Sequence, residues 1–201
     1  MANRLNLRMV PLVLHDRARD TFAQRDALGF LCTVSNTEAL RFVFDNLVAL
    51  RAAGMYEPAS LEALIGTRTN HEHWTLDSLR FLLSFADQAR LQAAGDPLPG
   101  SGPCRLYRGV AGEARHRKAR GLHWTSSPNT AAWFARRFSW LADPAVYVVD
   151  VPGEAVLAYV RDRGEDDYLV ALVPGIRPRR LPELPEPIRP RSSATAQEAD
   201  G

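Results

Sequence analysis

Apolar residues recur at three- and four-residue steps through much of the first half of the chain. Between residues 36 and 54 the recurring positions are Leu40, Val43, Phe44, Leu47 and Leu50. This spacing is typical of an amphipathic helix that buries one face. Asn36 and Thr37 are suitable N-cap residues and Gly54 is a suitable stop. The pattern therefore predicts a single helix between them.

Further helices are expected up to residue 95. One spans residues 60–65, and another begins after Thr75, whose hydroxyl can cap it, and continues to Gly95. Residues 15–30 favour an additional helix. The first half of the chain is therefore expected to be helical.

The pattern changes after residues 95–103, a stretch rich in glycine and proline that predicts a linker. Short runs typical of β-strands follow, over residues 105–110, 145–151, 155–161 and 168–173. One helix interrupts them, over residues 128–138, with Pro128 in its first turn. This order predicts an α+β fold, in which a helical N-terminal half precedes a split mixed or antiparallel β core.

These changes divide the chain into three regions. Residues 1–100 are expected to form the helical region and residues 101–181 the β core. Residues 182–201 are rich in Pro, Glu, Ser and Ala and are expected to be disordered.

Composition adds few constraints. The chain has 201 residues, 46% of them hydrophobic, and a net charge of only +2, so overall charge favours neither a nucleic-acid nor a membrane partner. Cys32 and Cys104 have no metal-ligand spacing, and no metal is expected. Apolar runs fall short of the roughly 18 to 20 residues of a membrane helix, and the run at residues 9–14 is too short for a signal peptide. We expect a cytoplasmic protein, or one delivered into the cytosol of a target cell.

Chemistry is first indicated by Tyr107-Arg108-Gly109 in the first expected strand. The guanidinium fork of Arg108 suits phosphate or carboxylate, and Gly109 lets a ligand or another backbone approach closely. The alternative is an edge-strand arginine that faces water.

A second indication is the turn His123-Trp124-Thr125-Ser126 before the helix. Hydroxyl residues at such a place are N-caps by default, which accounts for Ser126 or Ser127 but not for Trp124. An aromatic ring beside hydroxyls also suits a nicotinamide ring, by stacking and hydrogen bonding. His123 is either a site residue or a packed strand residue.

The third indication is the acidic run Glu165-Asp166-Asp167 at the start of a late strand. Such a run is commonly a solvated turn. Alternation along an extended chain also puts Glu165 and Asp167 on one side, where both carboxylates could face one ligand. One could hold ribose hydroxyls and favour a developing positive charge, while the other orients a nucleophile.

The succession of these three motifs, over residues 104–175, resembles the arginine-serine-glutamate class of ADP-ribosyltransferases, in particular bacterial or phage mono-ADP-ribosyltransferases. Tyr107-Arg108-Gly109 matches the first motif. Trp124-Thr125 resembles a variant of the second, which feeds a helix containing Trp133-Phe134. Asp167 stands where the family usually has its catalytic glutamate, two residues after Glu165.

The resemblance implies a split β core, with N-terminal helices that cap an NAD cleft. It implies that Arg108 contacts the NAD phosphates or the nicotinamide-side ribose and that Thr125 and Ser126 shape the nicotinamide pocket. Asp167 would hold the ribose and stabilise the cation while Glu165 positions the acceptor; with a shifted alignment, Glu165 is itself the catalytic acid. The implied NAD-binding set is Tyr107, Arg108, Gly109, His123, Trp124, Thr125, Ser126, Trp133 and Phe134.

The function implied is transfer of ADP-ribose from NAD to a macromolecular acceptor, either protein or nucleic acid. The enzyme could be a toxin or a phage-defence effector, with a cognate antitoxin or immunity protein as a partner. Two alternatives stay open. One is an NAD glycohydrolase toxin, and the other is a catalytically inactive NAD-binding or interaction module.

Overall fold

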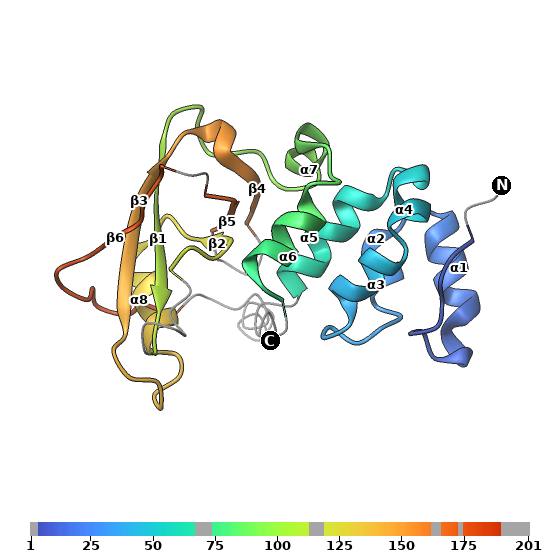
Figure 1. Cartoon of the computed structure of the whole chain (residues 1–201), viewed down its shortest axis with the longest axis horizontal. Coiled ribbons are helices and arrows are strands. Elements are labelled where there is room, and N and C mark those ends of the chain that lie inside the picture. Colours follow the sequence, from blue (N-terminus) through green and yellow to red (C-terminus); the bar gives the residue numbers. More distant parts are fainter. Residues whose placement is uncertain (1–3, 67–73, 113–118, 162–165, 173–174, 190–201) are drawn as a thin grey trace, which may run out of the picture. The chain divides into compact units, whose positions relative to one another are not determined.

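The computed structural model describes residues 4–66, 74–112, 119–161, 166–172 and 175–189. The chain divides into two compact units, Met1–Gly95 and Asp96–Gly201. The first is helical and the second carries the strands, so the α+β architecture with a helical N-terminal half is confirmed (Figure 1).

Short helices build the first unit. They are η1 (Leu12–Leu14), α1 (His15–Ala23), α2 (Ala27–Leu31), α3 (Ala39–Asp45), α4 (Leu47–Ala53), α5 (Tyr56–Gly66), α6 (Leu76–Leu83) and α7 (Gln88–Ala93). Helix α5 packs against α2, α3, α4 and α7. It buries residues all around its axis, which is the pattern of a helix at the centre of a core.

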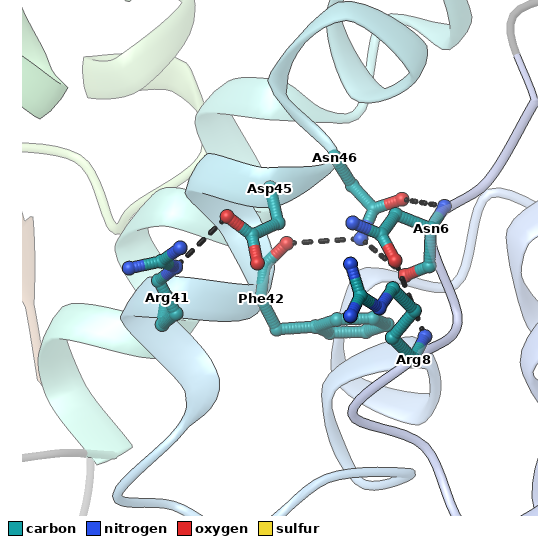
Figure 2. Close-up of polar contacts among 6 residues, drawn as sticks. All are labelled: Asn6, Arg8, Arg41, Phe42, Asp45 and Asn46. Carbon is teal, nitrogen blue, oxygen red and sulfur yellow. Dashed lines mark hydrogen bonds and ion pairs between the residues drawn. The ribbon is translucent and has the colours of Figure 1, made fainter.

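The single helix expected between residues 36 and 54 is wrong, because the chain breaks at Asn46 into α3 and α4. The buried amide of Asn46 donates from Nδ2 to the carbonyl oxygens of Phe42 and Asn6, at 3.0 Å each, and accepts from the Asn6 N–H at 2.7 Å (Figure 2). A side chain that bonds backbone groups in this way competes with the helical ladder. Gly54 ends α4 in the left-handed region, with φ of +70°, as expected.

The helix expected from Thr75 to Gly95 is likewise two helices. Thr75 caps α6 as predicted, since its hydroxyl accepts from the Ser78 N–H at 3.1 Å. Asp87 then caps α7 by accepting from the Arg90 N–H at 2.9 Å. The second cap starts a new helix because the Asp87 backbone is extended and so interrupts the first.

The second unit has two antiparallel sheets, with strand orders β1-β3-β6 and β2-β5-β4. Its elements are β1 (Cys104–Val110), β2 (His123–Trp124), α8 (Pro128–Arg136), β3 (Ala145–Val151), η3 (Gly153–Ala155), β4 (Val156–Val160), β5 (Asp167–Val170) and β6 (Arg179–Arg180). The four longer strands and α8 follow the sequence prediction closely. The two-residue strands β2 and β6 were not expected, because they are too short to show a period.

One backbone bridge joins the two sheets. The Tyr107 N–H donates to the Thr125 carbonyl at 2.7 Å, and the Thr125 N–H donates to the Tyr107 carbonyl at 2.9 Å. This bridge brings β1 beside the end of β2. The first two sequence motifs are therefore neighbours in the fold.

Helix α8 packs on β1 through close backbone contact. A Cβ atom at Gly109 would lie 1.8 Å from the Ala131 carbonyl oxygen and 2.6 Å from the Ala135 nitrogen. The sequence suggested that Gly109 lets either a ligand or another backbone approach closely. In the structure it is the backbone of α8 that approaches.

Within the described residues, no helix combines the length and the apolar character that crossing a membrane requires.

Candidate functional site

Arg108 lies in β1 and reaches toward β2. Its Nη1 donates to the backbone carbonyl of His123 at 2.6 Å. The guanidinium also lies against Gly121, since a Cβ atom there would be 2.2 Å from Nη2. Burial lowers the pKa of Arg108 to about 10, while the nearby Asp167 carboxylate acts in the opposite direction. Arg108 is thus a partly buried cation that is still charged at neutral pH, and not an edge-strand arginine that simply faces water.

His123 and Asp167 form a pair across β2 and β5. The Nδ1 atom of His123 lies 3.0 Å from Oδ2 and 3.3 Å from Oδ1 of Asp167. Asp167 is only 7% exposed. An ionised carboxylate can only accept hydrogen bonds. Nδ1 of His123 therefore carries a proton and donates it in a hydrogen bond to Asp167. Through His123, the structure brings together residues of all three sequence motifs.

Asp166 turns to different partners. Its Oδ1 accepts from the Tyr159 hydroxyl at 2.7 Å, and its Oδ2 accepts from the Ser126 hydroxyl at 3.0 Å. Burial and then this carboxylate raise the pKa of Tyr159 well above its ordinary value. No role was predicted for Asp166, although alternation along an extended chain directs its side chain away from the side of Asp167.

Trp124 is a core residue. This corrects the expectation that its ring stacks on a nicotinamide ring. It is 2% exposed, and its Nε1 donates to the Gly121 carbonyl at 2.8 Å. The ring lies in the apolar cluster between the sheets with Leu106, Val149, Val151, Val156, Tyr159, Tyr168, Val170 and Leu172. A side chain buried in this way has no face left for a ligand.

The hydroxyl residues of the turn divide between structural and candidate site roles. Ser127 is the N-cap of α8, and its Oγ accepts from the Thr130 N–H at 3.1 Å. The buried Thr125 hydroxyl accepts from the Ser127 N–H at 3.2 Å. Ser126, by contrast, is exposed and bonds to Asp166. Of the two residues expected to shape a nicotinamide pocket, only Ser126 presents itself to solvent.

Three residues of the expected NAD-binding set, Tyr107, Trp133 and Phe134, have their described side-chain contacts in and around α8. Tyr107 packs partly buried against the cluster of Ala131, Ala132 and Val146 under α8. Trp133 and Phe134 lie on α8 with their ring centroids 5.0 Å apart, and the guanidinium of Arg137 lies 5.8 Å from the Trp133 ring centroid. Glu165 lies outside the described residues, so its pairing with Asp167 remains a prediction.

Gly121 also belongs to the candidate site, and no role for it was predicted from the sequence. Its carbonyl holds the Trp124 ring, and its missing side chain leaves room for the Arg108 guanidinium. The available signal was a glycine two residues before the strand His123–Trp124, where a missing side chain lets another group approach closely.

A cavity of about 220 Å³ opens beside Ser126 and Tyr168, with Gly102, Cys104 and Leu106 among its other walls. Small-molecule sites usually measure about 300–1,000 Å³, so this space would admit a fragment of the size of nicotinamide but not a whole dinucleotide. In the part of the chain that the structure describes, no group of three or more His, Cys, Asp or Glu side chains is placed to hold a metal ion.

No protein-family model matches the chain, and comparisons with curated proteins and with solved structures also give no match.

Proposed function

We propose that the chain is a mono-ADP-ribosyltransferase that cleaves NAD and transfers ADP-ribose to a macromolecular acceptor. The observation that carries this proposal is the arrangement of Arg108, His123 and Asp167. A partly buried guanidinium is bonded to the carbonyl of the same histidine whose ring is bonded to a buried carboxylate. The order of the three sequence motifs supports the same assignment.

In the proposed reaction the bond between the ribose C1′ atom and the nicotinamide nitrogen breaks. Nicotinamide leaves with the electron pair, and positive charge develops on the ribose. The guanidinium of Arg108 would bind the NAD phosphates, for which its geometry is suited. Asp167 would favour the cationic ribose, because a carboxylate in a site of low exposure interacts strongly with a developing positive charge. A nucleophile of the acceptor then bonds to C1′ and loses its proton, a step in which the family resemblance would give Glu165 the positioning role.

A second candidate function, a catalytically inactive NAD-binding module, is favoured by one observation. Both carboxylate oxygens of Asp167 lie within 3.3 Å of the His123 ring, and the Asp167 side chain is 9% exposed. An aspartate held in this way is also one methylene shorter than the glutamate of the family that the sequence resembles. Its reach to a ribose could then be too short for turnover.

The test is nicotinamide release from NAD labelled in the nicotinamide ring. Arg108→Gln and Asp167→Asn are each expected to lower release by about 100-fold or more, which is the usual effect of losing one preorganised charged group. Arg105→Gln and Asp150→Asn are matched controls. Arg105 and Asp150 form an exposed ion pair, 2.8 Å from Nε to Oδ1, on the sheet that also contains Arg108. Their variants should keep the wild-type rate.

The outcomes separate the candidates. Release that is unchanged in both site variants would show that the residue assignments are wrong. NAD binding without release in the wild type, together with release in Asp167→Glu, would identify the inactive module. With NAD labelled in the adenylate half, label on protein or nucleic acid identifies a transferase, whereas free ADP-ribose alone identifies a glycohydrolase.

We further propose a cytoplasmic place of action, in the producing cell or in a target cell, since both hold the NAD that the reaction needs. A toxin or defence role predicts that induced expression stops growth and that Asp167→Asn relieves the arrest. Growth that is arrested equally by both forms would contradict that role. A cognate antitoxin or immunity protein would relieve the arrest by the wild-type chain.

A further inference from the structure

The helical unit contains a basic cavity that plays no part in the proposed reaction. It measures about 580 Å³, which lies within the usual size range of small-molecule sites. Its walls are Arg4, Leu5, Asn6, Leu7, Arg8, His15 and Arg19. Three of these residues are arginines, one is a histidine and none is acidic, so the lining carries charge of one sign.

The wall formed by residues 4–8 is fixed by a buried side chain. Asn46 is 2% exposed and forms two hydrogen bonds with the Asn6 backbone, one to its N–H at 2.7 Å and one from Nδ2 to its carbonyl at 3.0 Å. Asn6 in turn accepts from the Arg8 N–H through Oδ1 at 3.2 Å. Figure 2 shows Asn6 and Arg8 along this segment, with Asn46 facing Asn6. Arg8 therefore extends from an anchored backbone.

Another part of the wall is the first part of α1, which contributes His15 and Arg19. The Nε2 atom of His15 lies 3.0 Å from the Val10 carbonyl oxygen, which ties the start of the helix to the preceding segment. Arg19 is ion-paired with Asp16 at 2.7 Å, and this carboxylate is 94% exposed and is not part of the lining. The charge of Arg19 is therefore partly balanced outside the cavity.

Arg4 and Arg8 differ from Arg19 in this respect. Among the described residues, neither forms an ion pair, although the described part of the N-terminal unit contains Asp16, Asp20, Asp26, Glu38, Asp45, Glu57, Glu62, Asp77 and Asp87. Arg4 and Arg8 are exposed, and two guanidinium groups without a carboxylate partner on one anchored wall attract an anion together. A phosphate monoester or a diphosphate supplies two negative charges and several acceptor oxygens, which match two planar forks of donors.

We propose that this cavity binds the phosphate groups of a phosphate ester. The site is independent of the NAD reaction, because it lies within the helical unit and shares no residue with the Arg108 site. The phosphate could belong to a free nucleotide-like molecule or to the backbone of a nucleic acid, and both present the same chemistry to Arg4 and Arg8.

The test uses inorganic pyrophosphate and an eight-residue oligothymidylate as probes, with calorimetry for affinity and amide NMR shifts for location. Binding should shift the amides of Asn6, Arg8 and His15. The double variant Arg4→Gln/Arg8→Gln should weaken binding by about tenfold or more, since each lost charge-assisted bond has a substantial effect. Arg17→Gln/Arg25→Gln removes the same charge from the same unit outside the cavity and should change affinity by less than about twofold.

The two probes distinguish the sources of phosphate. Pyrophosphate binding that the oligonucleotide does not improve points to a small phosphate ester. Tighter oligonucleotide binding that weakens steeply with salt points to a nucleic-acid backbone. The proposal is overturned if neither probe binds, if both double variants lose affinity equally, or if the shifted amides lie outside the cavity.

Discussion

The guanidinium of Arg108 and the backbone carbonyl of His123 are joined by a 2.6 Å hydrogen bond between two different sheets. Because His123 is also bonded to Asp167, a change in the position of β2 would alter both contacts together. The candidate site therefore depends on the seam between the sheets, and residues that shape this seam should affect the site even when they carry no charge.

Gly121→Ala should displace the Arg108 guanidinium. The new Cβ atom would lie 2.2 Å from Nη2 and 2.4 Å from Cζ of Arg108. These atoms belong to a flexible side chain and can move, but the shift disturbs the 2.6 Å hydrogen bond from Nη1 to the His123 carbonyl, which costs about 1 to 3 kcal/mol in unfolding free energy. We expect a shifted Arg108 Nε–H resonance and NAD affinity that is weaker by about tenfold. Gly66→Ala is the control, since its Cβ atom has no neighbour within 4 Å and the residue lies outside the cavity beside Ser126. An unshifted resonance in Gly121→Ala would contradict the contact.

Gly109→Ala should destabilise the second unit strongly. Here the neighbours are backbone atoms of α8, with the Ala131 carbonyl oxygen 1.8 Å from the new Cβ atom, and they cannot move without shifting the helix. Overpacking of this kind typically costs about 1 to 3 kcal/mol or more, and we expect the upper part of that range. Urea unfolding measures the change, with Gly100→Ala as the reference, since a Cβ atom there has no neighbour within 4 Å. Equal stability of the two variants would show that α8 does not lie so close to β1.

Asp166→Asn should lower the pKa of Tyr159 toward its ordinary value. The Asp166 carboxylate accepts a hydrogen bond from the Tyr159 hydroxyl, and its negative charge opposes formation of a phenolate beside it. Both effects raise the pKa of Tyr159. Absorbance at the phenolate band during alkaline titration follows the change, with Tyr159→Phe used to assign the signal. Ser126→Ala leaves the carboxylate in place and serves as the control. A Tyr159 titration that does not move in Asp166→Asn would contradict the contact.

Tyr56 should make the helical unit less stable as pH rises. Its hydroxyl donates to the Leu82 carbonyl at 2.6 Å, and burial raises the pKa of Tyr56 to about 12. Between pH 10 and 12 the unfolded chain loses this proton while the folded chain retains it, so unfolding becomes easier as pH rises through this window. Below pH 10 the contribution is fully present.

Tyr56→Phe tests this pH dependence. It should cost about 1 kcal/mol near neutral pH by removing the hydrogen bond. It should also flatten the fall in unfolding free energy above pH 10 relative to the wild type, as measured by urea unfolding at a series of pH values. The same slope in both proteins would contradict the assignment to Tyr56.

Local signals in the sequence predicted local structure well. Thr75 and Gly54 mark a helix start and a helix end correctly, because a cap depends on residues within one turn. The strand at residues 145–151 was predicted with its observed bounds. The break at Asn46 could not be predicted in the same way, since it depends on Asn6, which is 40 residues away.

For the candidate site, the sequence by itself determined which side chains offer chemistry, and it selected Arg108, His123 and Asp167 by type and order. Only the tertiary structure decided how they are used. Packing between the sheets buries the Trp124 ring in the core, and strand alternation directs Asp166 to Tyr159 while Asp167 meets His123. A residue's type fixes which bonds it can form. Its partners are fixed by strands distant in sequence, whose registers are set by the whole apolar core.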